Sequence, residues 1–119
     1  MSVDRDPRSV LESYYEYVDA GETDALLELF ADDIRYERPG QGAIDGIEEL
    51  REFYERDRPL EDGTHEVDRM IVVDGHAAVR GRFSGVQDGD DVTFGFADHH
   101  EFEDGLIVER WSYTDRDTV

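Results

Sequence analysis

Two residues that can bind and release protons, Asp98 and His100, lie on the apolar side of a strand-like segment. Between residues 92 and 103 the sequence alternates with a period of two, which places successive side chains on opposite faces of a β-strand. The face that carries Asp98 and His100 otherwise holds apolar residues, namely Val92, Phe94, Phe96 and Phe102. A carboxyl group among apolar side chains costs free energy unless it is paired, protonated or used in chemistry. Asp98 is therefore either part of a functional site or a structural acid, bonded to Tyr14 or paired with an arginine.

His100, on the same face, is a candidate for acid–base chemistry; the alternative is a buried histidine that is hydrogen-bonded for structural reasons. His99 faces the other way, because adjacent residues of a strand point to opposite faces. Asp98, His99 and His100 therefore do not have the spacing of metal ligands on a strand, and we expect no metal site.

Turn signals define the strands that must position these residues. Asp-Gly pairs at 74–75 and 104–105 are typical two-residue hairpin turns, and residues 88–91 form a further polar turn between them. Together they predict an antiparallel meander of four strands, at 64–73, 76–87, 92–103 and 106–114.

The N-terminal half shows helical periodicity instead. Helices are predicted at about 7–20, 24–31 and 47–58, with a short strand at 34–38. Asp6 and Thr23 are candidate caps for the first two helices, and Asp45 opens the third as part of a capping box.

This order of elements predicts a single α+β domain over residues 1–119, with 1–6 as a flexible tail. A curved sheet wrapped around the helices would form a cone with an apolar pocket at its open end. On the last strand, Trp111 and Tyr113 face away from Arg110 and Ser112, so they are available for a partner.

Composition restricts the partners and the solvent. The chain has 32 acids against 12 bases, all of them arginine, and a formal charge of −20, so it should repel nucleic acid and anionic membranes. No cysteine is present and no apolar run is long enough for a membrane span, which favours the cytoplasm. The acids are spread along the chain, as in the cytoplasmic proteins of salt-accumulating halophiles.

Five stretches carry a resemblance to a known family: 14–21 (YYEYVDAG), 24–33 (DALLELFADD), 36–40 (YERPG), 46–54 (GIEELREFY) and 104–111 (DGLIVERW). They resemble the SnoaL-like and ketosteroid-isomerase-like branch of the NTF2-like superfamily, over about residues 8–115. The resemblance implies an NTF2-like cone in which three N-terminal helices pack on a curved, mainly antiparallel sheet. It implies no single activity, because this fold hosts isomerases, cyclases, hydrolases, dehydratases and non-enzymatic modules.

Carried over from ketosteroid isomerases, the resemblance implies that Tyr14 and Asp98 donate hydrogen bonds to a developing oxyanion, Asp98 as a neutral acid. The proton-shuttling aspartate of those enzymes falls on Arg38 in this chain. Because a guanidinium group cannot accept a proton, steroid isomerisation is not expected, and His100 is left as the acid–base group.

This chain also lacks residues that the other branches of the family use for their reactions. Polyketide-cyclase-like members commonly place His and Asp two residues apart on the last strand, where this chain has Arg110 and Ser112. Epoxide-hydrolase-like members need an arginine at the position of Phe96 and an aspartate at that of Ser112.

Two functions from different classes therefore remain. One is a small enzyme of isomerase, cyclase or lyase type that acts on a hydrophobic carbonyl or ring compound, with Tyr14, Asp98 and His100 as catalytic residues. The other is a non-catalytic dimeric module that binds a ligand or its own partner subunit. The residues expected to contact a ligand are aromatic or cationic: Tyr36, Arg38, Phe53, Tyr54, Phe83, Phe96 and Arg110.

Three further expectations complete the prediction. Arg38 lies beside Glu37, so it is either a pocket residue or a solvated or salt-bridged arginine. Arg110 either contacts a ligand or pairs with Asp98. No glycine-rich phosphate loop is present, so no cofactor is expected. The family resemblance and the outward aromatic residues of the last strand predict a homodimer formed sheet to sheet.

Overall fold

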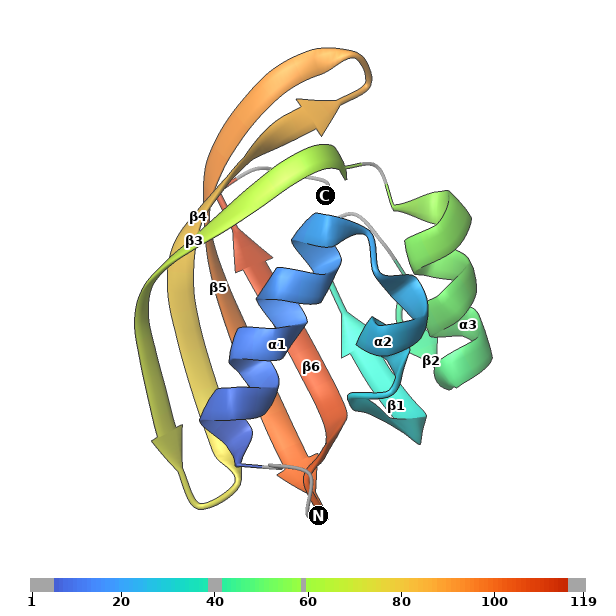
Figure 1. The fold of residues 1–119 in the computed structure, drawn as a ribbon, viewed down its shortest axis with the longest axis vertical. Helices are drawn as coiled ribbons and strands as arrows, with labels where there is room; N and C mark the ends of the chain where they lie inside the picture. The colour runs from blue at the N-terminus through green and yellow to red at the C-terminus, as the bar shows by residue number, and fades with distance from the viewer. Residues whose placement is uncertain (1–5, 39–41, 59, 116–119) are drawn as a thin grey trace.

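The computed structural model describes residues 6–38, 42–58 and 60–115, and shows a curved sheet with helices packed against one face (Figure 1). The strands are β1 (Phe30–Glu37), β2 (Ile44–Asp45), β3 (Leu60–Val73), β4 (His76–Gln87), β5 (Asp90–Glu103) and β6 (Leu106–Thr114). Across the sheet their order is β2-β1-β6-β5-β4-β3. Residues 1–5 of the predicted tail at 1–6 lie outside the described residues, whereas Asp6 is described.

The sheet is mixed. Strands β3 to β6 pair antiparallel in chain order, which confirms the predicted four-strand meander. β1 joins this meander by pairing with β6 in parallel, and β2 pairs antiparallel with β1. The predicted strand at 34–38 is therefore the second half of a longer strand that belongs to the same sheet.

The three hairpin turns of the meander share one backbone geometry. The φ values are 45° and 75° at Asp74-Gly75, 53° and 82° at Asp88-Gly89, and 52° and 78° at Asp104-Gly105. A pair of positive φ angles gives the turn a twist that matches the twist of the paired strands. The predicted turn at 88–91 is thus narrower than expected, and β5 already begins at Asp90.

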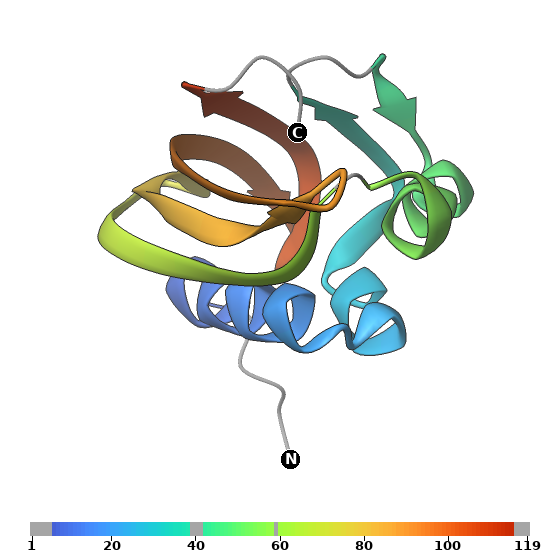
Figure 2. The same cartoon turned by 90° about the horizontal axis from the view of Figure 1, so that it is seen from above.

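Irregular pairing curves the sheet. The register between β3 and β4 shifts within 61–64 and again within 67–69, and such bulges bend the bulged strand and increase its twist. Gly81 of β4 lies at the second of these places, where a Cβ atom would collide with the carbonyl oxygen of Glu66. Figure 2 shows the resulting curl of β3, β4 and β5, with α1 and α2 lying together on one side of the sheet.

The first helix, α1 (Pro7–Ala20), confirms the prediction. The carboxylate of Asp6 accepts a hydrogen bond from the backbone N–H of Ser9 at 3.4 Å, and Pro7 occupies the first helical position. Gly21 ends the helix in the left-handed conformation, with φ of 73°.

The second helix is shorter than predicted, and the third reaches nearly its predicted end but changes its helical geometry on the way. α2 (Thr23–Leu27) ends before residue 31, because the chain passes into β1 at Phe30. α3 (Ile47–Glu52) continues as a π-helical turn, η1 (Phe53–Asp57). The predicted cap at Asp45 is wrong, since the cap position is Gly46 and no side chain bonds there.

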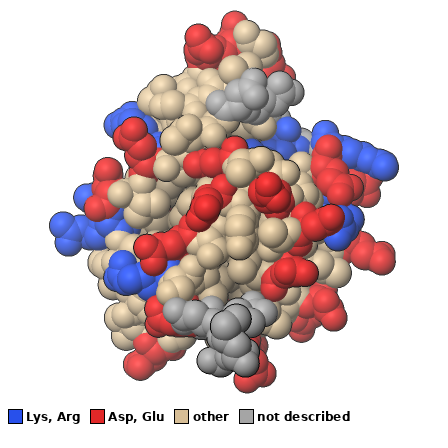
Figure 3. All heavy atoms as spheres, viewed as in Figure 1, with Lys and Arg blue, Asp and Glu red and all other residues tan. Residues whose placement is uncertain are grey.

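The core lies between α1 and the sheet. Five side chains of α1 with helical spacing are buried: Val10, Leu11, Tyr14, Tyr15 and Val18. Acidic residues are scattered over the surface, as one face shows (Figure 3). In the described part of the chain, no helix combines the length and the apolar character that crossing a membrane requires.

Candidate functional site

A narrow pocket opens where the ends of several strands meet. Its walls come from α1, the end of β1, the segment after η1, and strands β3, β5 and β6: Tyr14, Tyr36, Arg38, Arg58, Leu60, His65, Phe94, Phe96, Asp98, Arg110, Ser112 and Thr114. The free interior of this pocket is only about 20 Å³. A space of that size holds about one water molecule, so a larger ligand enters only if a side chain moves.

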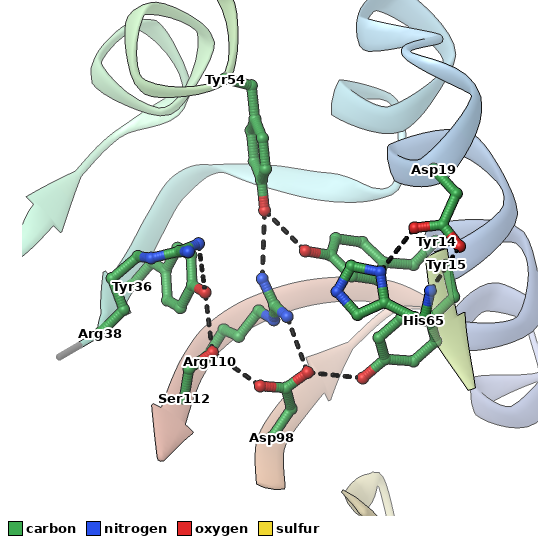
Figure 4. Close-up of polar contacts among 10 residues, drawn as sticks. All are labelled: Tyr14, Tyr15, Asp19, Tyr36, Arg38, Tyr54, His65, Asp98, Arg110 and Ser112. Carbon is green, nitrogen blue, oxygen red and sulfur yellow. Dashed lines mark hydrogen bonds and ion pairs between the residues drawn. The ribbon is translucent and has the colours of Figure 1, made fainter. Parts of the chain in front are cut away.

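The Asp98 carboxylate lies at the base of this pocket and is 2% exposed. One oxygen, Oδ2, accepts hydrogen bonds from the Tyr15 hydroxyl at 2.7 Å and from Arg110 Nη2 at 2.9 Å. The other, Oδ1, accepts one from Ser112 Oγ at 2.6 Å (Figure 4). We refer to Asp98, Arg110, Tyr15 and Ser112 as the Asp98 cluster.

These contacts determine the charge of Asp98. Burial by itself would raise the pKa of this carboxyl, but the Arg110 guanidinium and the hydrogen bonds from Ser112 and Tyr15 hold the pKa well below its usual range. Asp98 is therefore an anion at neutral pH. The expectation that it donates a hydrogen bond as a neutral acid is wrong, and the alternative of pairing with Arg110 is confirmed.

Arg110 is held from four directions. Besides its bond to Asp98, Nη1 donates to the Tyr54 hydroxyl at 3.1 Å. Its guanidinium lies between two aromatic rings, 4.2 Å from the centre of Tyr14 and 4.5 Å from that of Tyr36. Burial opposes its charge, yet Asp98 keeps the pKa of Arg110 well above its ordinary value, so the ion pair stays charged.

Tyr14 contacts this cluster through its ring and through Tyr54, and its expected bond to Asp98 is made by Tyr15 instead. The hydroxyl groups of Tyr14 and Tyr54 are 2.7 Å apart, and either can donate. Burial raises the pKa of Tyr14 well above its ordinary value, although Arg110 acts in the opposite direction. Tyr14 is thus a neutral phenol that lines the pocket.

A second set of hydrogen bonds reaches Asp98 from Arg38. Because the single proton of Ser112 goes to Asp98, the Tyr36 hydroxyl must donate to Ser112 Oγ, at 2.7 Å. Arg38 Nη1 then donates to the Tyr36 oxygen at 3.0 Å. Arg38 is 9% exposed and packs on the ring of Phe53, so the alternative of a solvated arginine is wrong.

A further pair, Asp19 and His65, carries no signal in the sequence. Asp19 lies on α1, and its Oδ1 is 2.5 Å from Nδ1 of His65 on β3, while its Oδ2 accepts the His65 backbone N–H at 2.8 Å. The carboxylate thereby assigns the proton to Nδ1 and leaves the lone pair on Nε2. Burial lowers the pKa of His65 even though Asp19 acts to raise it, so the ring is neutral at neutral pH.

His100 is fully buried and does not line the pocket. Its ring lies 6.2 Å from that of Tyr14 and 6.4 Å from that of Phe102, and within the described chain neither ring nitrogen has a hydrogen-bond partner. Burial lowers its pKa to about 3, followed in importance by the charge of Arg110. The inward orientation predicted for His100 is confirmed, but the structure does not bring it to the place where a ligand would bind.

The remaining expected ligand contacts divide into two groups. Tyr36, Arg38, Phe96 and Arg110 line the pocket. Phe53, Tyr54 and Phe83 lie behind them, against Arg38, Tyr14 and His65 respectively. Arg58, which also lines the pocket, was missed because the sequence marks it only as the end of the predicted third helix.

Comparisons with known proteins agree with this fold. The sequence pattern of the SnoaL-like domain matches residues 11–110. None of the curated proteins matches the chain significantly. Among solved structures, an NTF2-like protein of unknown function from Burkholderia pseudomallei superposes with a TM-score of 0.83 at 20% identity, covering 91% of this chain and 89% of that one.

Two other similar structures have names that indicate activities. An LEH-like epoxide hydrolase from M. tuberculosis has a TM-score of 0.79 at 18% identity, covering 90% of this chain and 80% of its own. IdmH from Streptomyces antibioticus, a proposed polyketide cyclase, has a TM-score of 0.76 at 21% identity, with 92% and 91% covered. At such identities the likeness establishes the NTF2-like fold and leaves the reaction open.

Proposed function

Because the chain belongs to the SnoaL-like domain family, we propose that its cone binds a small carbonyl or ring compound and acts on it by acid–base chemistry. One observation carries this proposal: a neutral, oriented imidazole and a neutral phenol backed by a buried cation line the same pocket. The imidazole is His65, held by Asp19, and the phenol is Tyr14, linked to Arg110 through Tyr54. Paired groups whose environments differ in this way are typical of acid and base roles.

In the proposed reaction, Nε2 of His65 removes a carbon-bound proton next to a carbonyl group. Negative charge then develops on the carbonyl oxygen, and Tyr14 donates a hydrogen bond to it. Since Arg110 donates to the Tyr54 oxygen, Tyr54 is free to donate to Tyr14, which directs the Tyr14 proton to the ligand. Asp98 keeps its charge throughout and serves to hold Arg110 in place.

The proposal assigns to His65 the proton transfer that the sequence assigned to His100. Arg38, at the position of the isomerase base, only donates hydrogen bonds, so negligible turnover of a 3-keto steroid remains our prediction. The narrow free interior also favours a substrate smaller than a steroid.

Deuterium exchange of a small ring ketone tests this chemistry. 2-Tetralone in heavy water should lose its signal for the protons next to the carbonyl faster with the protein than with buffer, as followed by proton NMR. His65→Gln should slow the enzymatic exchange by ~10²–10⁴-fold, the usual contribution of a general base. His76→Gln, whose ring is half-exposed at a hairpin end, is the matched control and should leave the rate unchanged.

The pH dependence of exchange adds a second readout. Besides burial, which has the largest effect, the charged groups that act on the pKa of His65 are Asp19, Arg58 and Asp98, and the net result is a lowered pKa. The rate should therefore stay constant as the pH falls through 6.5, where an ordinary histidine would begin to gain its proton. An unchanged rate in His65→Gln would remove His65 from the mechanism.

A non-catalytic binding module is the second candidate. The observation that favours it is the arginine at the isomerase base position, which leaves the pocket without the proton acceptor of those enzymes. Ligand binding without exchange by wild type, across several small ketones, would support this candidate over the enzyme.

We also propose that two copies associate through the outer face of the sheet. Tyr113 on β6 and Ile71 on β3 are 59% and 52% exposed, which is high for large apolar side chains. Tyr113→Glu should convert a dimer into a monomer in sedimentation at high salt. It is a cleaner test than a change at Trp111, because the Trp111 indole N–H bonds Glu37 and its replacement would disturb the fold.

A further inference from the structure

The cone pocket has an excess of positive charge within a strongly acidic protein. Three arginines and one aspartate line it, whereas the whole chain carries a formal charge of −20. The single carboxylate, Asp98, is bonded to Arg110. Arg38 and Arg58, which we call the unpaired arginines, have no carboxylate partner within the described chain.

Other arginines of the described chain show that acids are readily recruited as partners. Arg35 pairs with Asp45 at 2.9 Å, Arg51 with Asp24 at 2.8 Å, and both of these pairs are at the surface. Pairing of this kind is easy in a chain with 32 acids. Two arginines left without an acid at the walls of one pocket therefore call for a physical explanation.

One donor of each unpaired arginine also lacks a hydrogen-bond acceptor, although Arg38 Nη1 bonds the Tyr36 hydroxyl. In both, the Nε atom is buried and has no partner among the described residues. An unsatisfied buried donor costs free energy, and more when it is charged. Burial and the neighbouring charge of Arg38 both lower the pKa of Arg58, which shows that the two cations act on each other. The site is short of a negatively charged acceptor.

We propose that the unpaired arginines, Arg38 and Arg58, bind the carboxylate group of a ring-bearing organic acid. A carboxylate is planar and offers two oxygens to the planar fork of a guanidinium group. Leu60, Phe94 and Phe96 supply an apolar wall for the ring. A monoanion fits better than a phosphate dianion, because the fixed negative charge of Asp98 lies in the same pocket.

The ligand would enter at Arg58. The free interior holds about one water molecule, and Arg58 is only half-buried, whereas Arg38 and Arg110 are 9% and 3% exposed. Arg58 can therefore swing outward and return over the bound carboxylate. This inference deepens the proposed function, since it names the substrate class of the same pocket, but binding needs no turnover.

A pair of matched ligands tests the proposal. 2-Naphthoate and 2-naphthylmethanol share one ring system and differ in charge, and calorimetric titration at constant salt compares their affinities. Wild type should bind the carboxylate at least ~10-fold more tightly, a difference of about 1.4 kcal/mol. Raising chloride should weaken binding of naphthoate and leave that of the alcohol unchanged.

Substitutions locate the effect. Arg58→Gln should lower the affinity for naphthoate by ~10-fold or more and leave that for the alcohol unchanged, consistent with the loss of a charge-assisted hydrogen bond. Arg58→Lys should restore part of it, because lysine keeps the charge without the fork. Arg56→Gln, two residues away and paired with Glu52 at the surface, is the control and should bind naphthoate like wild type.

Three results would overturn the inference: equal affinities for the two ligands, undiminished naphthoate binding by Arg58→Gln, or no binding of either naphthoate or the smaller benzoate. Its failure is distinct from failure of the proposed function. Exchange of 2-tetralone without carboxylate binding would leave the acid–base chemistry and remove the carboxylate site. Naphthoate binding without exchange of any ketone would leave the carboxylate site and remove the acid–base chemistry.

Discussion

The Asp98 cluster and the unpaired arginines lie in one pocket but differ in how their polar groups are satisfied. The Asp98 carboxylate accepts three hydrogen bonds and pairs with a cation that is itself held between two rings. Arg38 and Arg58 have no carboxylate partner among the described residues, whereas Arg110 has Asp98, although the Nε of all three is buried without an acceptor there. Satisfied groups hold a protein together, whereas unsatisfied ones store free energy that a ligand can release. Substitutions in the Asp98 cluster should therefore lower stability, whereas substitutions of the unpaired arginines should lower ligand affinity.

The largest expected loss of stability follows a substitution in the Asp98 cluster. Asp98→Asn keeps the shape of the side chain but leaves Arg110 buried without a counter-charge, and such breaks cost about 3–5 kcal/mol. Urea unfolding in high salt should show this loss of stability. Asp24→Asn, at an exposed pair with Arg51, is the control and should change stability by less than about 1 kcal/mol. A similarly small effect of Asp98→Asn would show that the cluster does not stabilise the fold.

The stabilisation that the charged Asp98 provides should also be lost from the wild-type protein when acid protonates this carboxylate. The pKa of Asp98 is lower in the folded state than in the unfolded chain, so its contribution to stability is complete above the unfolded value near 3.8 and is lost as the pH falls further. Asp98→Asn should lack this portion of the acid dependence, which unfolding curves between pH 4.5 and 2.5, flanking about 3.8, would reveal.

A middle-sized effect is expected at His100, a buried ring whose two nitrogens have no hydrogen-bond partner among the described residues. Because its pKa falls from 6.5 to about 3 on folding, stability is lost as the pH is lowered from the first value towards the second. The loss at pH 5 is about 2 kcal/mol. His100→Leu removes the titration, so the variant should gain on wild type by that amount between pH 7 and pH 5. Parallel stability curves for the two proteins over this range would contradict the assignment.

The smallest effect is expected at the unpaired arginines. Arg58→Gln removes a cation that repels Arg38 and has no acid partner in the described chain, so the free energy of unfolding should stay constant or rise by up to about 1 kcal/mol. Thermal unfolding without ligand, beside Arg56→Gln, measures it. A loss of more than about 1 kcal/mol would mean that Arg58 stabilises the fold, and the separation of stability from binding would then be lost.

Local patterns predicted the elements better than they predicted the site. The alternation of β5 correctly placed Phe94, Phe96, Asp98 and His100 on one buried face. The parallel pairing of β1 with β6 joins segments far apart in the chain, and no local signal encodes it. The choice of Tyr15 over Tyr14 as the partner of Asp98 depends on how α1 is rotated against the sheet, which helical spacing leaves open because both tyrosines are buried.

The pair of Asp19 and His65 shows the same limit. Asp19 lies near the end of a helix and His65 near the start of a strand, in stretches where acids and polar residues are common. Only the packing of α1 on β3 brings them together. Pairing of Asp98 with Arg110, by contrast, was among the expected alternatives, because the inward faces of adjacent strands can be read from their alternation.

The parallel pairing of β1 with β6 also determines the order in which the fold can form. The hairpins of β3 to β6 close through two-residue turns, so their contacts are local and their loop-closure entropy is small. Phe30 instead pairs with Ile107, and this contact closes a loop that spans most of the chain. Long-range pairings of this kind form slowly. On the ribosome, β1 emerges early but can pair with β6 only after every other strand of the sheet has been made.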